Sequence, residues 1–183
     1  MPIAPKSRST LAPLVTAAAA LMLSACDTIP ALPEERIGSA TLMLASGLPA
    51  GTVQILATGD QVSLAVAATG LTEGERGFHL HTTGECRRPD FTSAGGHLNP
   101  LGRTHGSLSD RGAHFGDMPN LRVRSGGTAS MTVDLPGTRA QIEQWLFDAD
   151  GTAVVIHAQA DDYRTDPTGN AGDRVACGVI TRG

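Results

Sequence analysis

The sequence predicts an all-β domain, an eight-stranded sandwich or flattened barrel with two long functional loops. The 22 glycines and 11 prolines among 183 residues are typical of a chain with many turns. Several short runs alternate apolar and polar residues, which places every second side chain on one face of a strand. Aromatic residues make up only 3% of the chain, so smaller aliphatic side chains must fill the core.

Eight segments carry the strand pattern, with hairpin turns at Gly59-Asp60 and Gly126-Gly127. In chain order, the predicted strands lie at residues 40–46, 53–55, 62–66, 75–82, 121–123, 129–133, 152–159 and 174–181. Residues 138–147 open with Thr138-Arg139-Ala140-Gln141, a sequence typical of a capping box, and predict one short helix.

Two stretches do not show a strand pattern, residues 83–120 and residues 161–173. A long loop without regular structure is uncommon inside a compact domain and usually has a function. The first of these loops contains three histidines and a nearby aspartate, which predicts that a bound metal orders it.

The first 25 residues are predicted to be a signal peptide, since basic residues precede an apolar run of about 13 residues. Such a run is too short for a bilayer core that needs about 20 residues. It ends in Leu23-Ser24-Ala25-Cys26, which resembles the lipobox of bacterial lipoproteins and implies that Cys26 is acylated. Residues 26–36 would then be a lipidated tether and residues 37–183 the folded domain. The alternative is a plain signal peptide with a chance cysteine.

The cysteine count agrees with export. With Cys26 acylated, Cys86 and Cys177 remain as a pair in an oxidising compartment, and we expect a disulfide between them. Two unpaired buried thiols are the alternative. The formal net charge of −4 excludes a polyanion binder, so no nucleic-acid partner is expected.

The six histidines of the chain point to metal binding. His79 and His81 alternate with Phe78 and Leu80, so both imidazoles lie on one face of a strand and can approach one ion, with His157 as a third ligand. Imidazole-rich sites suit copper or zinc. The long loop offers a tetrahedral set suitable for zinc: His97, His105, His114 and Asp117.

Five motifs together resemble the copper/zinc superoxide dismutases. They are Gly77-Phe78-His79-Leu80-His81, Ala94-Gly95-Gly96-His97-Leu98-Asn99-Pro100, His105-Gly106, His114-Phe115-Gly116-Asp117 and the segment from Gly169 to Ile180. The resemblance spans residues 40–180 and implies a Greek-key sandwich that binds one copper and one zinc ion.

The resemblance also implies a role for each site residue. Copper would be held by His79, His81, His97 and His157, and zinc by His97, His105, His114 and Asp117. His97 would serve both ions, one with each ring nitrogen. Asp161 would orient a ligand of each metal, Cys86 and Cys177 would form the disulfide of the family, and Arg174 would guide the substrate anion. Alternatively, Arg174 pairs with a carboxylate such as Asp173.

The expected function is that of an exported superoxide dismutase, which converts superoxide to oxygen and hydrogen peroxide. We expect it on the periplasmic side of a bacterial envelope, with Cys26 as its membrane anchor. The alternative is a non-catalytic copper/zinc buffer or metallochaperone on the same scaffold, although such relatives tend to lack a copper ligand or the arginine. A copper-only dismutase conflicts with the intact zinc set. The resemblance leaves open a monomer or a homodimer.

Overall fold

The computed structural model describes Met1 and residues 32–183. The predicted signal peptide, Cys26 and the first part of the predicted tether lie outside the described residues. Within the described part, no helix is long and apolar enough to cross a membrane.

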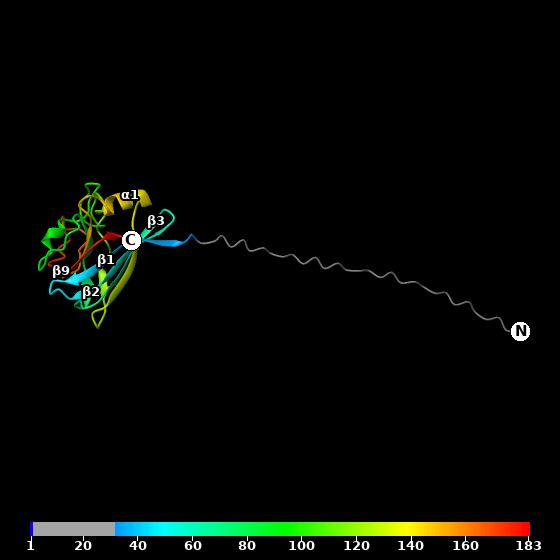
Figure 1. Cartoon of the computed structure of the whole chain (residues 1–183), viewed down its shortest axis with the longest axis horizontal. Helices are drawn as coiled ribbons and strands as arrows, with labels where there is room; N and C mark the ends of the chain where they lie inside the picture. Colours follow the sequence, from blue (N-terminus) through cyan, green and yellow to red (C-terminus); the bar gives the residue numbers. More distant parts are fainter. Residues whose placement is uncertain (2–31) are drawn as a thin grey trace. The chain divides into compact units, whose positions relative to one another are not determined.

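The described part of the chain contains ten strands and two short helices (Figure 1). The strands are β1 (Glu34–Leu44), β2 (Pro49–Thr58), β3 (Gln61–Ala68), β4 (Gly74–Arg76), β5 (Phe78–His81), β6 (Leu121–Val123), β7 (Ala129–Asp134), β8 (Ala153–His157), β9 (Arg174–Val179) and β10 (Thr181–Arg182). The α-helix α1 spans Arg139–Leu146, and the 3-10 helix η1 spans Thr92–Ala94.

Eight of these strands form one curled sheet in the order β5-β8-β9-β1-β2-β3-β7, with β10 paired to β1. The strands β4 and β6 form a second sheet, and every pair in both sheets is antiparallel. Because β9 returns to lie beside the first of three consecutive strands, the order is that of a Greek key. The predicted all-β fold class is therefore confirmed.

The segment 75–82, predicted as one strand, is two strands that belong to different sheets. The strand β4 pairs with β6, whereas β5 pairs with β8. The chain changes sheet at Gly77, whose N–H donates to Gln159 O at 2.7 Å. A Cβ at this position would come within 2.7 Å of the Ala171 side chain, so the crossing requires glycine.

Two other predicted boundaries also differ from the structure. The segment 174–181 divides into β9 and β10 at Ile180, whose N–H donates to Thr152 O at 2.9 Å. The strand β1 begins at Glu34, so residues 34–36 belong to the sheet and not to the tether. All three residues pair with β2, at Thr58, Ala57 and Leu56, and the side chain of Glu35 also pairs with Arg139 of α1 at 2.8 Å.

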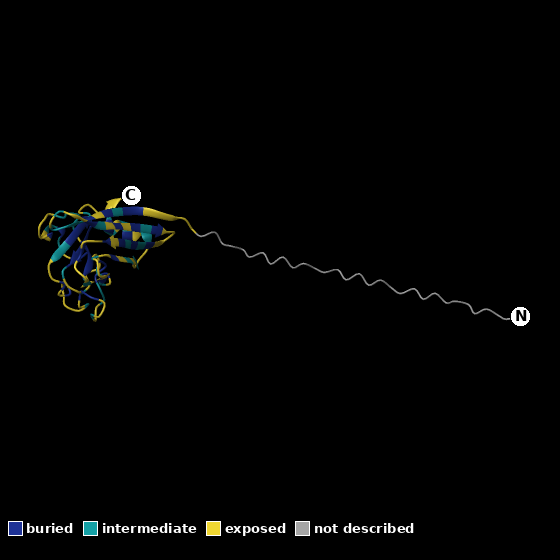
Figure 2. Cartoon of the chain, turned by 90° about the horizontal axis from the view of Figure 1, so that it is seen from below, coloured by how far each residue is buried: buried dark blue, intermediate teal, exposed yellow. Residues whose placement is uncertain are grey.

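An apolar core fills the inside of the curled sheet. Along β2 and β3, buried and more exposed residues alternate. Figure 2 shows such changes of colour along strands of the sheet. All five residues of β8 are buried, with Val154 and Ile156 in the main core. Ala153 and Val155 face a second apolar cluster that includes Phe91. The strand β8 is therefore covered on both faces.

The helix α1 begins with the predicted capping box. Thr138 Oγ1 accepts a hydrogen bond from Gln141 N at 3.3 Å, and Gln141 Oε1 accepts one from Thr138 N at 3.1 Å. Both bonds satisfy donors that a helix leaves free at its start. Ile142 and Leu146 of the helix are fully buried against the sheet.

Candidate metal centre

The long loop 83–120 is ordered because part of it continues the sheet beyond the edge of β5. Leu80 N donates to Gly116 O at 2.9 Å, and Leu80 O accepts from Leu98 N at 2.8 Å. Gly116 N in turn donates to Leu98 O at 2.9 Å. A Cβ on Gly116 would meet Leu80 O at 2.3 Å, so this close pairing requires glycine. The loop histidines are thereby placed against those of the strand.

Four buried histidines meet at this edge of the sheet. They are His79 and His81 of β5, His97 of the loop, and His157 at the end of β8. Their candidate ligand atoms all lie within 4.8 Å of one another. The structure thus brings together all four residues that the sequence predicts for copper.

Each of these rings has one bonded nitrogen and one buried nitrogen without a partner. The bonded contacts are His79 Nε2 with Asp161 Oδ2 at 2.7 Å, His81 Nδ1 with Gly95 O at 3.0 Å, His97 Nδ1 with Asp117 Oδ1 at 2.8 Å and His157 Nδ1 with Gly172 O at 3.1 Å. The nitrogens without a partner are His79 Nδ1, His81 Nε2, His97 Nε2 and His157 Nε2. Buried polar atoms are rarely left without a partner, and four converging imidazole nitrogens fit a copper ion.

Burial keeps three of these imidazoles neutral. It lowers the pKa of His81 to about 2 and the pKa of His157 to about 3, and neighbouring histidines add to the effect. Burial also lowers the pKa of His97 to about 4, although the hydrogen bond to Asp117 opposes this change. A metal binds the neutral form of imidazole, so these three rings carry the required lone pair at neutral pH.

A second group shares His97 and adds His105, His114 and Asp117. Three ring nitrogens surround Asp117 Oδ1, with Nδ1 of His97 at 2.8 Å, of His105 at 3.1 Å and of His114 at 3.3 Å. Ligands at about 2.0 Å from a tetrahedral zinc ion lie roughly 3.3 Å from one another. The spacing therefore fits zinc, and His114 Nδ1 is buried without a hydrogen-bond partner.

The charge of this second group suits a divalent cation. Burial alone would raise the pKa of Asp117, but hydrogen bonds from His105 and its neighbours hold that pKa well below its usual value. Asp117 Oδ2 also accepts the backbone N–H groups of Gly106 at 2.8 Å and His114 at 3.0 Å. Burial would lower the pKa of His105, whereas hydrogen bonds to Asp117 and Asp161 raise it to about 9. The carboxylate is thus ionised and held in a fixed position.

A single buried carboxylate connects the two groups. Asp161 Oδ2 accepts a hydrogen bond from His79 Nε2 at 2.7 Å, and Oδ1 accepts one from His105 Nε2 at 3.0 Å. Burial would raise the pKa of Asp161, but these hydrogen bonds hold it below its usual value. Asp161 therefore lies between one predicted ligand of each metal.

Asn120 holds Asp161 in place, a role that no sequence pattern indicated. Its Nδ2 donates to Asp161 O at 2.9 Å, and its Oδ1 accepts from Asp161 N at 2.8 Å. Its own N–H donates to Tyr163 Oη at 2.7 Å. Gly169 is a further such residue, since a Cβ there would meet Asp161 Oδ1 at 1.9 Å. Neither residue belongs to a periodic pattern, so only the contacts reveal their part in the site.

Arg174 is fixed to the long loop at the start of β9. Its Nη1 donates to Phe91 O and its Nη2 to Gly95 O, both at 2.7 Å. Gly95 O also accepts from His81 Nδ1, so the arginine and one predicted copper ligand share an acceptor. The alternative that Arg174 pairs with Asp173 is wrong, because no salt bridge of Arg174 occurs in residues 32–183.

Cys86 and Cys177 form a disulfide with Cα atoms 5.8 Å apart and a sequence separation of 91. The bond fastens the long loop to β9, the strand that begins with Arg174. The predicted pairing is confirmed, and the alternative of two free thiols is wrong.

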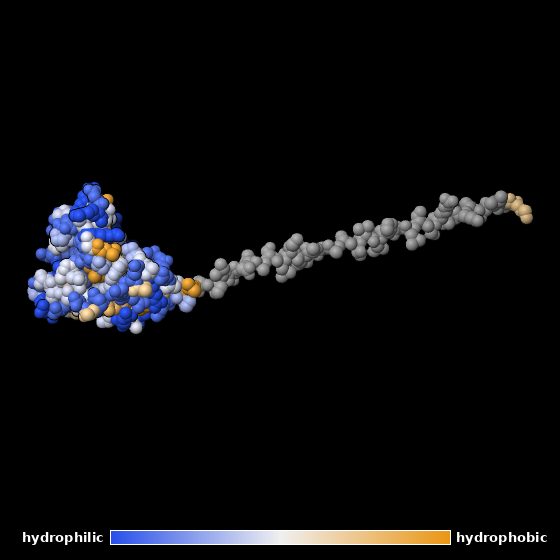
Figure 3. Space-filling model, turned by 90° about the horizontal axis from the view of Figure 1, so that it is seen from above, coloured by the Kyte–Doolittle hydropathy of each residue, from blue (hydrophilic) through white to orange (hydrophobic). Residues whose placement is uncertain are grey.

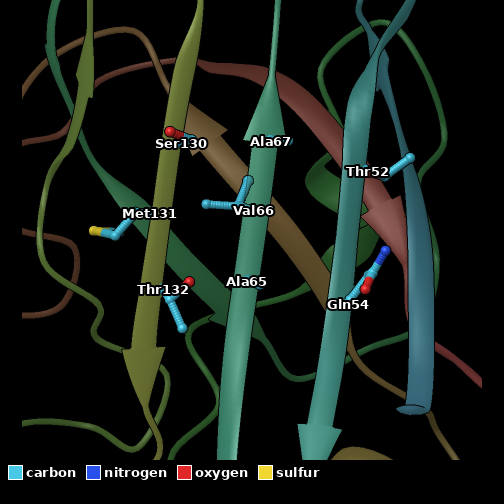
Figure 4. A pocket seen from close by; sticks show the side chains of 8 residues that line it. All are labelled: Thr52, Gln54, Ala65, Val66, Ala67, Ser130, Met131 and Thr132. Atoms are coloured by element: carbon cyan, nitrogen blue, oxygen red, sulfur yellow. The ribbon is translucent and has the colours of Figure 1, made fainter.

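Two other features of the surface lack metal-ligating side chains. A groove of 450 Å³ crosses the outer face of β2, β3 and β7, but no ionisable side chain lines it (Figure 4). The large hydrophobic side chains that are more than half exposed in the folded domain are Leu32, Leu48, Leu101 and Leu108. On the face that Figure 3 shows, hydrophobic colour occurs only in small separate areas. The histidine cluster is therefore the candidate functional site.

Comparisons with known proteins agree with this site. A model of the family "copper/zinc superoxide dismutase" matches residues 49–180. A protein named superoxide dismutase [Cu-Zn] 2 of Aquifex aeolicus is 42% identical over 144 residues, 77% of this chain and 84% of that protein. The superoxide dismutase [Cu-Zn] of Caulobacter vibrioides is 38% identical over 172 residues, 91% and 98% of the two chains. A solved structure of a SOD-like protein from Bacillus subtilis has a TM-score of 0.71 at 38% identity, covering 77% of this chain and 96% of that one.

Proposed function

The chain belongs to the copper/zinc superoxide dismutase family, an oxidoreductase class with copper and zinc as cofactors, and on this basis we propose that its two histidine groups form one joined metal centre that converts superoxide outside the cytoplasm. One observation carries the proposal. Four buried ring nitrogens without partners converge from His79, His81, His97 and His157. These residues would hold copper, while His97, His105, His114 and Asp117 would hold zinc.

Copper, when bound, would supply the one-electron oxidation and reduction that turn two superoxide ions and two protons into oxygen and hydrogen peroxide, and zinc bound by the second group would help to keep the imidazole of His97 in place. Arg174 would bind the substrate anion. A guanidinium has five N–H groups, and two of them donate to Phe91 O and Gly95 O. The other three are free to donate to a small anion. Without Lys6 and Arg8 of the predicted signal peptide, the formal net charge changes from −4 to −6, which repels superoxide at a distance, so local positive charge must dominate near the site.

His97 would hold a proton for the forming peroxide. Its Nδ1 lies 2.8 Å from Asp117 Oδ1, among the atoms of the zinc group. Its Nε2 is buried without a partner among the atoms of the copper group. With zinc on Nδ1, a proton on this ring would reside on Nε2, among the atoms of the copper group.

We propose that the protein acts on the periplasmic side of a bacterial envelope, anchored through an acylated Cys26. The basic and apolar start of the chain and the lipobox-like Leu23-Ser24-Ala25-Cys26 support export and lipidation. The disulfide between Cys86 and Cys177 supports an oxidising compartment.

The purified mature protein is expected to bind one copper and one zinc ion per chain and to accelerate superoxide decay. Elemental analysis together with a superoxide-decay assay checks both points. If the protein contains only zinc, even after loading with copper, the copper assignment is contradicted. Both metals without turnover would show instead that the protein is a metal buffer or a metallochaperone.

Intact mass spectrometry of protein from an exporting bacterial host is expected to show an acylated Cys26 at the amino terminus and no free thiol. An unmodified Cys26 in membrane-free material would refute the anchor.

Reductant should loosen the long loop and speed metal loss before the sheet unfolds, because Cys86 fastens that loop to β9. Metal release at a chelator is the measurement, and circular dichroism monitors the sheet.

A further inference from the structure

A cavity of 740 Å³ opens beside Arg174, between β9 and the part of the long loop that the disulfide fastens. The residues that line it are Leu44, Ala45, Ser46, Pro89, Asp90, Thr92, Gly172, Asp173, Arg174 and Val175. Arg174 is the one basic side chain in this lining, and Asp90 and Asp173 are its two carboxylates. An anion that reaches the guanidinium through this cavity therefore passes fixed negative charge.

The carboxylate of Asp90 is held in one position. Its Oδ1 accepts hydrogen bonds from Thr92 N and Thr92 Oγ1, both at 3.0 Å. These bonds keep the pKa of Asp90 below its usual value, so the group is ionised at neutral pH. Asp90 directly precedes Phe91, whose carbonyl accepts Nη1 of Arg174 at 2.7 Å. The loop thus places a negative charge next to the arginine.

This charge acts on the guanidinium without neutralising it. Burial lowers the pKa of Arg174, and the charge of Asp90 opposes that effect. Arg174 forms no salt bridge in the described part of the chain, and its two hydrogen bonds go to backbone carbonyls. Its charge and its remaining N–H groups are therefore available to a ligand, in the field of Asp90.

We propose that Asp90 is a specificity-determining residue that disfavours dianions at Arg174 more strongly than monoanions such as superoxide. The inference rests on the proposed role of Arg174 as the anion-binding group. The repulsion between a fixed charge and a ligand scales with the charge of the ligand. Across roughly 8 Å of water at low ionic strength, one unit charge changes the affinity for a monoanion about 2-fold and for a dianion about 4-fold.

The variant Asp90→Asn tests the proposal, since asparagine keeps the oxygen that accepts from Thr92 and loses the charge. At about 10 mM ionic strength and pH 8, superoxide turnover by the copper- and zinc-loaded protein should rise about 2-fold. The affinity for inorganic phosphate, mostly a dianion at this pH, should rise about 4-fold in a calorimetric titration. Both gains should vanish at about 0.3 M sodium chloride, where a charge acts over only a few ångströms.

Two further variants test whether the effects come from the charge of Asp90 itself, and not from the altered side chain or from the loss of any one negative charge. Asp90→Glu keeps the charge but moves the acceptor, and it should behave like the wild type. Glu34→Gln removes the same charge at the start of β1, ten residues along the strand from the cavity-lining Leu44, and should change neither property. The proposal fails if superoxide and phosphate gain equally, if the gain survives high salt, or if Glu34→Gln reproduces it. If the wild-type protein shows no turnover, the proposed function fails, while the phosphate titration still tests Asp90.

Discussion

Replacing Arg174 by isoleucine is expected to reduce superoxide turnover by about 10- to 150-fold with both metals still bound. One charge-assisted hydrogen bond to a small anion is worth about 1.5–3 kcal/mol, and each 1.4 kcal/mol is about tenfold in rate. Arg174 belongs to neither predicted ligand set, so its loss should leave the metals in place. Superoxide decay, normalised to the copper content of each sample, is the measurement.

Two companion variants separate charge from loop fastening, because Arg174 also donates to Phe91 O and Gly95 O. Arg174→Lys keeps the charge but not the forked donors, so it should lose less activity than the isoleucine variant. Arg174→Glu should lose more, and added salt should slow it less than the wild type because the salt screens the new repulsion. Unchanged turnover in the isoleucine and glutamate variants at full metal occupancy would contradict the role of Arg174.

Asp161→Asn is expected to lower the affinity for copper and for zinc together, by about 10- to 100-fold each. The two carboxylate oxygens accept from His79 Nε2 at 2.7 Å and from His105 Nε2 at 3.0 Å. Asparagine has a single acceptor oxygen and no charge, so it loses one of these bonds and weakens the other, and both metals should be affected. Competition with a chelator measures each affinity, and circular dichroism confirms that the sheet is retained.

The neighbouring Asp162→Asn is a matched control, because it removes the same charge from the same loop. Asp162 accepts hydrogen bonds within the loop, from the backbone of Arg164 and from Thr165 and Asn170. It should leave both affinities within about twofold, as is usual for an exposed surface group. Loss of one metal only in Asp161→Asn, or equal losses in both variants, would show that Asp161 does not join the two groups.

The fold could be predicted wherever one face of a strand is buried. Alternation marks β2 and β3 because each has one buried and one more exposed face, and it marks β7 because one face is partly buried against the core. The division at Gly77 could not be predicted, because residues 75–82 show one continuous strand pattern and the change of partner depends on a distant carbonyl, Gln159 O. The start of β1 was missed because Glu34 and Glu35 look like a polar tether, while both pair with β2, at Thr58 and Ala57.

The sequence predicted the candidate metal ligands better than it predicted the groups that hold those ligands in position. Every predicted ligand lies in one of the two groups, because the ligand residues are of few chemical types at distinctive spacings. Asn120 and the carbonyl of Gly95 were not predicted, since backbone acceptors and single amides leave no pattern in a sequence. The ion each group binds remains a prediction from the resemblance.

The direction of β1 determines how the protein can be held on a surface. The strand starts at Glu34 and rises about 33 Å before Leu44, which pairs with Ala176 beside the anion cavity. The last strand, β10, pairs with β1 near its start, at Gly38 and Ser39 (Figure 1). Both ends of the domain therefore emerge on the side away from Arg174. A bead or a fusion partner attached at either end of the domain would therefore lie on the side away from the anion cavity.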